Sequence, residues 1–488
     1  MSREVRRVTV RFGRLGTFVL ICTLAACATN PATGRRMLSL VSEGQEIEMG
    51  QAYSQQVEST MALYDDPALQ SYVNDIGQRL AATSERPGLP WSFKVVDDPV
   101  VNAFALPGGY IYVTRGILTH FNSEAELASV IGHEIGHVTA RHSVEQISRA
   151  QLGTLALGVG SILSEDVRRF GGVAQTGMAV LFLSYGRNDE HEADMLGVRY
   201  SLRDSYDPRE AVNVHVMLGR QTSTRGGSGV PSWLSTHPSS VDRVDRIRAQ
   251  VDTIPNATLA RTRISRDEFL EKIDGAVFGV NPRHGFFRGQ TFLHPDLAFT
   301  LRFPAEWPVA NLTQAVLARG PDEDAILELT LSSGGHAAAA SEFFAQDGVR
   351  ERDVRATSIN GAPATTGDFE VRTDDGTLEG MAAFLDFDGR TYRILGYTVE
   401  GKRTTYRSGF AQTIASFDRL TERAALDVQP LEIELVTVQR STTLRRMVEG
   451  RETPVTPEEL AILNGVDLDE PIEPGRTIKW VTGDPPPG

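Results

Sequence analysis

Hydrophobic residues recur at helical spacing in the first part of the chain. Between residues 46 and 84 the texture is helical, with a restart expected at Pro67 and one apolar face made of Leu69, Tyr72, Val73, Ile76 and Leu80. A further helix is expected to begin at Ser123, because Ser123-x-x-Glu126 is a capping-box pattern. It carries apolar residues inward and continues through His133. The first part of the chain is therefore predicted to be mainly helical.

Short alternating segments predict strands in two regions. Residues 91–97 and 110–114 are expected to form a small sheet, the second strand following the turn Pro107-Gly108-Gly109. From about Phe286 the texture changes to strands at 298–303, 325–331, 367–372, 380–387 and 391–398, with a helix at 407–417. The pattern therefore predicts an α+β fold in which a helical domain comes before a module rich in strands.

Length and charge narrow the class of protein. A chain of 488 residues is too long for one ordinary core, so about two to four domains are expected. The formal net charge of −14 disfavours a nucleic-acid partner held through phosphate contacts.

Residues 1–26 read as an export signal and not as part of the fold. Five arginines precede a short apolar run at 17–24, which leads into Leu24-Ala25-Ala26-Cys27. This stretch looks like the lipobox of bacterial lipoproteins, which would make Cys27 the lipidated first residue of the mature chain. The alternative is a transmembrane helix, but the apolar run is well short of the ~20 residues that a span needs. Ala28 after the cysteine is typical of lipoproteins that reach the outer membrane.

His133-Glu134-Ile135-Gly136-His137 is the strongest chemical motif of the chain. Positions four apart lie on one face of a helix, so both imidazoles can reach one ion. Glu134 lies roughly 100° round the helix and can reach a water on the metal instead of the metal itself. The spacing therefore predicts a Zn²⁺ ion, with Glu134 as the general base in peptide-bond hydrolysis.

A catalytic zinc needs a third protein ligand. Ser143 occupies the position at which a metzincin would have a further histidine, so this ligand must come from elsewhere. A second predicted helix near residues 187–194 offers Glu190 and Glu192, and the residues alone do not decide between them.

Glu190-x-x-Ala193-Asp194, about fifty residues after the His-Glu-x-x-His motif, resembles metallopeptidase family 48. That family includes HtpX, the CaaX prenyl proteases and the periplasmic BepA-like zinc endopeptidases. Three further stretches resemble it: residues 102–109, His137-Val138-x-x-Arg141-His142, and Thr236-His237-Pro238 with Arg243. Together the matches cover residues 100–245. One departure is Gly186, where the family more often has a serine.

The resemblance implies a gluzincin site with one zinc ion per chain. It implies that Glu190 is the third ligand, and that Asp194 is an acid orienting one of the ligand imidazoles. His142, His191 and His215 are interpreted as structural histidines.

Two further features bear on catalysis. The segment Asn102, Ala103, Phe104 and Ala105 looks like an edge strand to which a substrate peptide could add, although it could also merely frame the core. His237 follows the Gly/Ser-rich segment 222–232. It is interpreted in three ways: as a latch on the open coordination position, as a donor to the oxyanion, or as a packed loop residue. The latch is favoured.

The rear of the chain contains no cluster of catalytic residues. Residues 286–420, with Phe303-Pro304-x-x-Trp307, are similar to PsbP-like modules, and a binding or spacing role is expected there in preference to a second enzyme. Residues 431–482 look like a degenerate LysM module, with Leu460-x-x-Leu463-Asn464-Gly465 at its helix–loop junction. Such modules bind glycans of the peptidoglycan type. Thr442-Thr443 replaces the usual Gly-Asp pair, so a purely structural module is the alternative.

The sequence predicts four regions: a signal peptide at 1–26, a mainly helical gluzincin domain with a small edge sheet at 27–265, an α/β sandwich-like module at 286–420, and a LysM-like βααβ module at 431–482. The expected function is a zinc endopeptidase that cleaves misfolded or misassembled envelope proteins. It would face the periplasm, held by lipid at Cys27 in the inner leaflet of the outer membrane, with peptidoglycan as a possible partner. The alternative is a non-catalytic scaffold or chaperone with a structural zinc, which Glu134 disfavours because a structural site needs no base.

Overall fold

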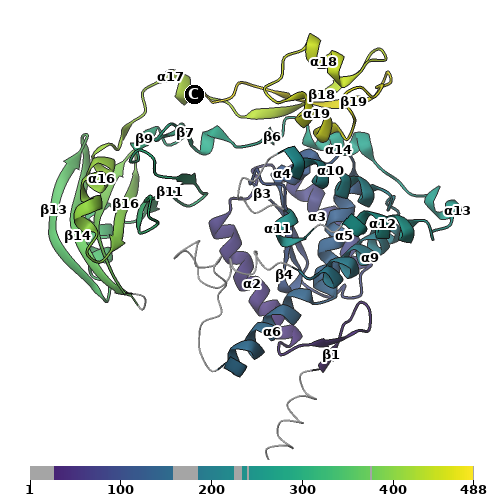
Figure 1. Ribbon diagram of the computed structural model, residues 1–488, viewed down its shortest axis with the longest axis horizontal. Helices are drawn as coiled ribbons and strands as arrows, with labels where there is room; N and C mark the ends of the chain where they lie inside the picture. The colour runs from purple at the N-terminus through teal and green to yellow at the C-terminus, as the bar shows by residue number, and fades with distance from the viewer. Residues whose placement is uncertain (1–26, 158–184, 225–232, 239–240, 374–375, 487–488) are drawn as a thin grey trace, which may run out of the picture. The chain divides into compact units, whose positions relative to one another are not determined.

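The computed structural model describes residues 27–157, 185–224, 233–238, 241–373 and 376–486. The predicted signal sequence at 1–26 and residues 225–232 of the Gly/Ser-rich segment lie outside the described residues. Contacts between residues divide the chain into two units (Figure 1). Unit 1 comprises Met1–Gly279 and Ile433–Val481, and unit 2 comprises Val280–Glu432 and Thr482–Gly488.

Unit 1 is mainly helical in its described part. Its helices are α2 (Glu43–Thr60), α3 (Pro67–Ala82), α4 (Arg115–His120), α5 (Glu124–Thr139), α6 (His142–Leu157), α9 (Arg187–Arg203), α10 (Glu210–Thr224), α11 (Trp233–Thr236), α12 (Val241–Val251), α13 (Asn256–Leu259) and α14 (Arg266–Ile273). The face predicted on α3 is buried at Leu69, Val73, Ile76 and Leu80. Helix α5 is buried along its whole length and lies at the centre of the core.

A three-stranded sheet lies beside these helices. Its strands are β3 (Ser92–Val96), β4 (Ala103–Leu106) and β5 (Tyr110–Thr114), in the order β3-β5-β4, and the 3-10 turn η1 (Pro107–Gly109) joins β4 to β5. Strand β3 is parallel to β5, and β4 is antiparallel to it. In this described sheet β4 is therefore an edge strand, next to α5.

Small residues let α5 and α9 approach closely. A Cβ atom added at Gly132 would lie 3.2 Å from the backbone oxygen of Gly197, and one added at Gly136 would lie 3.1 Å from the backbone of Ala193. Larger side chains at these positions would push the two helices apart. The glycine inside His-Glu-x-x-His and the alanine inside Glu-x-x-Ala-Asp therefore set the distance between the two motifs.

The C-terminal part of unit 1 has the element order strand–helix–helix–strand: β18 (Leu431–Thr437), α18 (Leu444–Gly450), α19 (Pro457–Asn464) and β19 (Thr477–Thr482). Its strands form a sheet with β6 (Val277–Phe278), in the order β19-β18-β6. The fully buried Lys479 donates hydrogen bonds to the backbone oxygens of Thr119, at 2.8 Å, and Phe121, at 2.6 Å. This segment is therefore packed against the end of α4, just before α5 begins. Its resemblance to a LysM module stays a prediction.

An N-terminal hairpin also belongs to unit 1. Strands β1 (Cys27–Thr29) and β2 (Arg36–Leu38) pair antiparallel, with Thr29 opposite Arg36. The backbone N–H of Gly34 donates to the oxygen of Asn30 at 2.9 Å, which closes the turn between the two strands.

The described part of unit 2 combines two antiparallel sheets with three α-helices, the last of which is a single turn. The larger sheet has the order β10-β11-β12-β16-β15-β14-β13 and the smaller one the order β17-β9-β8-β7. The bounds are β7 (Phe286–Arg288), β8 (Thr291–His294), β9 (Phe299–Arg302), β10 (Val309–Asn311), β11 (Val316–Arg319), β12 (Ala325–Ser332), β13 (Val349–Ile359), β14 (Ala362–Thr373), β15 (Gly376–Phe387), β16 (Arg390–Val399) and β17 (Asp418–Arg419), with η2 (Pro282–His284) and α17 (Arg423–Leu426) at the ends.

Side chains alternate across the large sheet of unit 2 with a period of two. Ala382 and Phe384 pack with α15 (His336–Phe344), whereas Ala383 and Leu385 pack with α16 (Arg403–Ala415) and the small sheet. The prediction of an α+β chain, with a helical region followed by separate sheets, is therefore confirmed at that level of detail.

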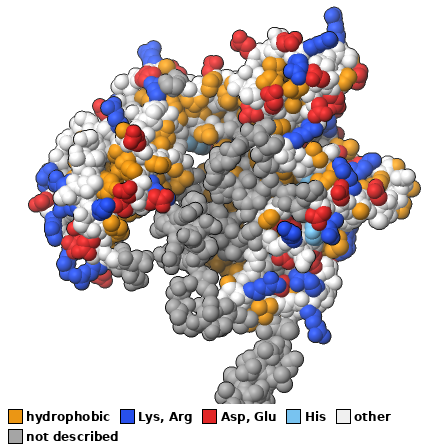
Figure 2. Space-filling view, viewed as in Figure 1, with side chains coloured by type: hydrophobic (Ala, Val, Ile, Leu, Met, Phe, Trp, Pro, Cys, Tyr) orange, Lys and Arg blue, Asp and Glu red, His pale blue; other side chains and the backbone are white. Residues whose placement is uncertain are grey.

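No helix among the described residues is both long and apolar enough to cross a membrane. On the face shown in Figure 2, acidic and basic side chains are interspersed and do not form one large patch of either sign.

Candidate metal centre

Helix α5 carries the first two candidate ligands. The side chain of Ser123 accepts a hydrogen bond from the backbone N–H of Glu126, as the capping pattern predicted. The Glu126 carboxylate accepts from the backbone N–H of Asn122, and not from that of Ser123 as a full capping box requires. One face of the helix then presents His133 and His137, whose Nε2 atoms lie 3.0 Å apart. Both imidazoles are buried.

Helix α9 brings two carboxylates to the same place. Glu190 Oε1 lies 3.6 Å from His137 Nε2, and Glu190 Oε2 lies 3.8 Å from His133 Nε2. One turn further along, Asp194 Oδ1 lies 3.0 Å from His133 Nδ1, on the side of that ring that faces away from Glu190. The close packing of α5 on α9 therefore places Glu190 among the imidazole nitrogens and Asp194 behind one of them.

A third histidine joins the group from the segment that contains α11. His237 Nδ1 lies 3.3 Å from His133 Nε2 and 3.0 Å from Glu190 Oε1. Its backbone N–H donates to the oxygen of Trp233 at 2.7 Å, and its ring stacks on the Trp233 ring with centroids 4.2 Å apart. His237 is therefore held with Nδ1 toward the other candidate ligands.

The four side chains fit a metal ion. His133, His137, Glu190 and His237 each offer one ligand atom, and these atoms lie within 4.8 Å of one another. A tetrahedral zinc ion with bonds of about 2.0–2.2 Å has ligand atoms roughly 3.3–3.5 Å apart. The measured separations of 3.0 to 3.8 Å are close to that spacing. Three imidazoles and one carboxylate are also the donors that zinc prefers.

Burial keeps the imidazoles neutral, which is the form that binds a metal. Burial lowers the pKa of His133 to about 4, against the hydrogen bond with Asp194, which acts to raise it. Burial also lowers the pKa of His137 and of His237 well below the usual range. For Asp194, burial alone would raise the pKa, but hydrogen bonds from His133, His215 and Arg243 lower it well below its usual range.

Glu134 is buried beside the candidate ligands without being one of them. Its Oε1 lies 3.5 Å from His237 Nε2, and within the described part of the chain neither carboxylate oxygen has a hydrogen-bond partner of good geometry. Its pKa is raised well above the usual range, first by burial and then by the charge of Glu190, while Arg243 and the backbone of Ala105 act to lower it. A buried carboxylate with open oxygens calls for a partner such as water or a cation.

Arg243 on α12 holds both acids of α9 in place. It pairs with both oxygens of Asp194, and its Nη1 lies 2.7 Å from Glu190 Oε2. In the sequence, Arg243 stands out only through the family resemblance. Its contact with Asp194 joins residues that are 49 positions apart in sequence, so local spacing gives no signal for it.

Two aromatic rings at the site were also missed from the sequence. The ring of Tyr185 stacks on that of His137, with centroids 3.8 Å apart and an angle of 22° between the planes. Its hydroxyl is paired with the hydroxyl of Ser143 at 2.9 Å. Trp233 packs against both His133 and His237. These rings shield the imidazoles from solvent.

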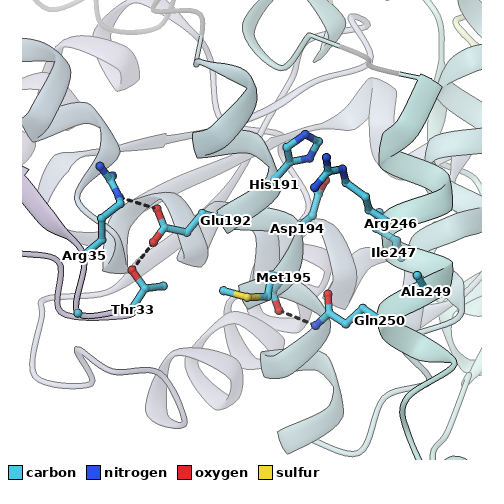
Figure 3. A pocket seen from close by; sticks show the side chains of 11 residues that line it. Thr33, Arg35, His191, Glu192, Asp194, Met195, Arg246, Ile247, Ala249 and Gln250 are labelled. Atoms are coloured by element: carbon cyan, nitrogen blue, oxygen red, sulfur yellow. Dashed lines mark hydrogen bonds and ion pairs between the residues drawn. The ribbon is translucent and has the colours of Figure 1, made fainter.

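A second group of polar side chains lies behind His137. His142 Nδ1 lies 2.9 Å from His137 Nδ1, and His142 Nε2 lies 3.1 Å from Glu192 Oε2. Glu192 therefore points away from the four ligand atoms and toward the N-terminal hairpin. There it contacts Thr33 and Arg35, at the margin of a pocket of about 740 Å³ bounded by the hairpin tip, α9 and α12 (Figure 3).

The predicted substrate strand coincides largely with β4. Ala103, Phe104 and Ala105 lie in β4, and Asn102 directly precedes it. The backbone of Ala105 acts to lower the pKa of Glu134.

Comparison with known proteins supports the family resemblance. The model of peptidase family M48 matches residues 67–251, which include all the candidate ligands. The beta-barrel assembly-enhancing protease of Escherichia coli is 32% identical over 229 residues, covering 44% of this chain and 46% of that protein. The mitochondrial metalloendopeptidase OMA1 of Arabidopsis thaliana is 37% identical over 196 residues, covering 40% and 38%.

OMA1 of Schizosaccharomyces pombe is 32% identical over 245 residues, covering 47% of this chain and 67% of that protein. The chain thus spans less than half the length of the Escherichia coli and Arabidopsis thaliana relatives. Among solved structures, the cyanobacterial PsbP of Synechocystis aligns with a TM-score of 0.23 and 17% identity, over 27% of this chain and 91% of that one. The PsbP-like assignment of residues 286–420 stays a prediction.

Proposed function

Because the chain belongs to peptidase family M48, we propose that it is a zinc-dependent endopeptidase that hydrolyses peptide bonds in envelope proteins. One observation carries the proposal: the ligand atoms of His133, His137 and Glu190 converge beside the buried carboxylate of Glu134. A structural metal site would have no use for that carboxylate, whereas hydrolysis requires a base.

In the proposed mechanism His133, His137 and Glu190 hold the zinc ion. When bound, the metal would act as a Lewis acid that activates water and polarises the peptide carbonyl. Glu134 accepts the proton of the attacking water and then delivers it to the nitrogen of the leaving amine. Its place suits this role, because Glu134 is buried beside the candidate ligands without being one of them.

Asp194 and Arg243 position the ligands in this proposal. Asp194 accepts a hydrogen bond from His133 Nδ1, which leaves Nε2 free to bind the metal. Arg243 fixes the carboxylates of Asp194 and Glu190 with respect to each other.

The substrate is proposed to add as a strand to the segment Asn102–Ala105. Backbone hydrogen bonds along an edge strand align a peptide without reading its side chains. The neighbouring Glu134 would then face a carbonyl of the added strand. This mode suits unfolded segments, which have backbone groups to offer.

His237 is proposed to be a latch that keeps the enzyme latent. Its Nδ1 lies among the ligand atoms, where it can fill the coordination position that water needs. The competing role is a donor to the oxyanion during attack, from the same segment.

The site of action is proposed to be the periplasmic face of the outer membrane. Support comes from the lipobox-like sequence before Cys27 and from the name of the Escherichia coli relative, a beta-barrel assembly-enhancing protease. The proposed substrates are misfolded or misassembled envelope proteins. The LysM-like residues 431–482 would add a contact with peptidoglycan.

Two measurements test the endopeptidase. The whole chain should contain about one zinc ion and cleave casein, and a chelator should remove both properties together. Glu134→Gln should retain the zinc but lose proteolysis by at least ~100-fold, because general-base catalysis contributes about that much. If the zinc-loaded protein cleaves no unfolded substrate, a scaffold function is favoured instead. If Glu134→Gln turns over substrate as fast as the unaltered chain, the mechanism is wrong.

A further inference from the structure

The two imidazoles on α5 are supported in different ways. His133 Nδ1 faces a carboxylate, Asp194 Oδ1, at 3.0 Å. His137 Nδ1 faces another imidazole, His142 Nδ1, at 2.9 Å. His137 and His142 are each about 1% exposed, so water does not substitute for this contact. The support of His137 therefore depends on what holds His142.

The distances allow one arrangement of protons along this chain of contacts. If His137 binds a metal through Nε2, its proton is on Nδ1 and it donates to His142 Nδ1. His142 then has its own proton on Nε2, which lies 3.1 Å from Glu192 Oε2 and donates to it. The result is an imidazole–imidazole–carboxylate relay that ends at Glu192.

Glu192 is in turn held by the N-terminal hairpin. Asn30 Nδ2 donates to Glu192 Oε1 at 3.0 Å. The hydroxyl of Thr33 donates to the same oxygen, and Arg35 Nε lies 3.5 Å from Oε2 (Figure 3). Asn30 is only 1% exposed, and its own side-chain oxygen accepts from the backbone N–H of Ala32 at 2.9 Å. The turn of the hairpin is thus shaped by the residue that reaches Glu192.

We propose that the hairpin segment Asn30–Arg35 positions the metal ligand His137 through Glu192 and His142. The inference rests on the proposed function only in taking His137 as a zinc ligand. It makes Glu192 a positioning residue, and His142 likewise. Because the hairpin begins at Cys27, the segment that would join the body to the membrane lipid also orients a ligand of the metal centre.

A second cation is the competing explanation for the same cluster. His142, Asp189 and Glu192 have ligand atoms within 4.8 Å of one another. The guanidinium of Arg35 already lies 3.5 Å from Glu192 and 3.9 Å from Asp189, and it supplies a positive charge there. Arg35 also pairs with Glu145 at 2.9 Å, so it offsets only part of the negative charge. It nonetheless places a cationic group against both carboxylates, where a second metal ion would have to bind, and this favours positioning.

Positioning predicts a coupling that acts in both directions. If the hairpin raises the affinity for zinc by some factor, zinc must stabilise the ordered hairpin by the same factor. Amide protons of residues 28–38 should therefore exchange more slowly in the zinc-loaded chain than after removal of the metal.

The first experiment measures the zinc affinity of the whole chain by competition with a chromogenic chelator. His142→Leu should weaken the affinity by about tenfold or more, as is typical for loss of an outer hydrogen-bond partner. His142→Gln should restore most of it, because its amide can accept from His137 and donate to Glu192. Thr33→Val combined with Arg35→Ala should weaken it in the same direction, whereas Arg36→Ala, at an exposed neighbour, should not.

The second experiment measures amide exchange in residues 28–38 with and without zinc. Zinc should slow the exchange in the unaltered chain and in Arg36→Ala, but not in Thr33→Val/Arg35→Ala. The latter variant changes no residue of α5 or α9, so it tests the proposal even if His142→Leu does not fold. Equal zinc affinity in all variants would overturn this inference and leave the proposed function standing. If His142→Gln and His142→Leu lose the same amount of zinc affinity, His142 acts only through packing. If each chain binds two zinc ions, a second ion explains the cluster and the positioning role is wrong. If the unaltered chain binds no zinc, both proposals are wrong.

Discussion

The guanidinium of Arg243 lies against both oxygens of Asp194, with Nε 2.8 Å from Oδ2 and Nη2 2.7 Å from Oδ1. Both residues are buried, and Asp194 in turn contacts His133 Nδ1. Such a bidentate pair has a defined geometry and holds the carboxylate in one orientation. Arg243 therefore orients Asp194, and through it His133, at the candidate metal centre.

This pair predicts that Asp194→Ala lowers zinc affinity. Loss of the acid frees the His133 ring and leaves the buried Arg243 without its bidentate partner, so we expect a decrease of about 10- to 100-fold. Chelator competition measures it. Asp245→Ala, on an exposed position of α12, is the matched control. An unchanged affinity in Asp194→Ala would show that His133 needs no orienting acid.

Glu190→Ala removes a proposed ligand and should have the larger effect. Because the latch His237 could take its place, the test is made in the His237→Ala background, where only His133 and His137 remain. There the chain should lose its zinc on dialysis against a weak chelator. Asn188→Ala, in the exposed first turn of the same helix, should retain it. Stoichiometric zinc in Glu190→Ala after the same dialysis would assign the third ligand elsewhere.

His237→Ala separates the three roles considered for this residue. A latch predicts that proteolysis and self-cleavage rise while zinc is retained. A donor to the oxyanion predicts a decrease of turnover by ~100-fold or more, again with zinc retained. Activity per folded molecule equal to that of the unaltered chain would leave only packing against Trp233. His191→Ala on α9 is the control, and we expect the latch.

Cys27→Ser tests the lipid anchor. Lipidation requires the thiol, so labelling with radioactive palmitate should disappear and cleavage after Ala26 should stop. The measurement is metabolic labelling followed by N-terminal mass analysis. A variant processed at the same residue as the unaltered chain would contradict the lipoprotein assignment.

The stability of unit 1 should depend on pH through Glu126. Burial raises its pKa to about 7 from an ordinary value of 4.5. Between these two values the folded state keeps the proton of Glu126, whereas the unfolded chain releases it. The free energy of unfolding therefore contains the full contribution of Glu126 below pH 4.5 and loses it as the pH rises to about 7. In Glu126→Gln the midpoint of urea unfolding should decrease less across that pH range than in the unaltered chain. Tryptophan fluorescence measures the unfolding. The same slope as in the unaltered chain would assign the pH dependence to other groups, and Glu48→Gln is an exposed control.

Much of the local structure could be predicted from sequence. Helix α5 begins after Ser123 as its capping pattern indicated, and strand β5 has the predicted bounds. His133 and His137 lie on one face, because spacing by four residues within one helix is a local property. Glu190 and Asp194 share a face of α9 for the same reason. The His-Glu-x-x-His and Glu-x-x-Ala-Asp motifs were therefore readable without the fold.

Contacts between distant segments were decided only by the tertiary structure. Lys479 lies 360 residues from Thr119 in sequence, and its ammonium group is nonetheless buried at the end of α4. Glu192 was an equal candidate to Glu190 from the residues alone, and its direction toward Asn30 was set by a hairpin 162 residues away. The sequence by itself determined which residue types recur on each helix face, because neighbours along the chain fix that periodicity. Which faces meet, and which buried charges pair across them, followed from the packing of α5, α9, α12 and the N-terminal hairpin, since no local pattern encodes the partner of a side chain that lies far away in sequence.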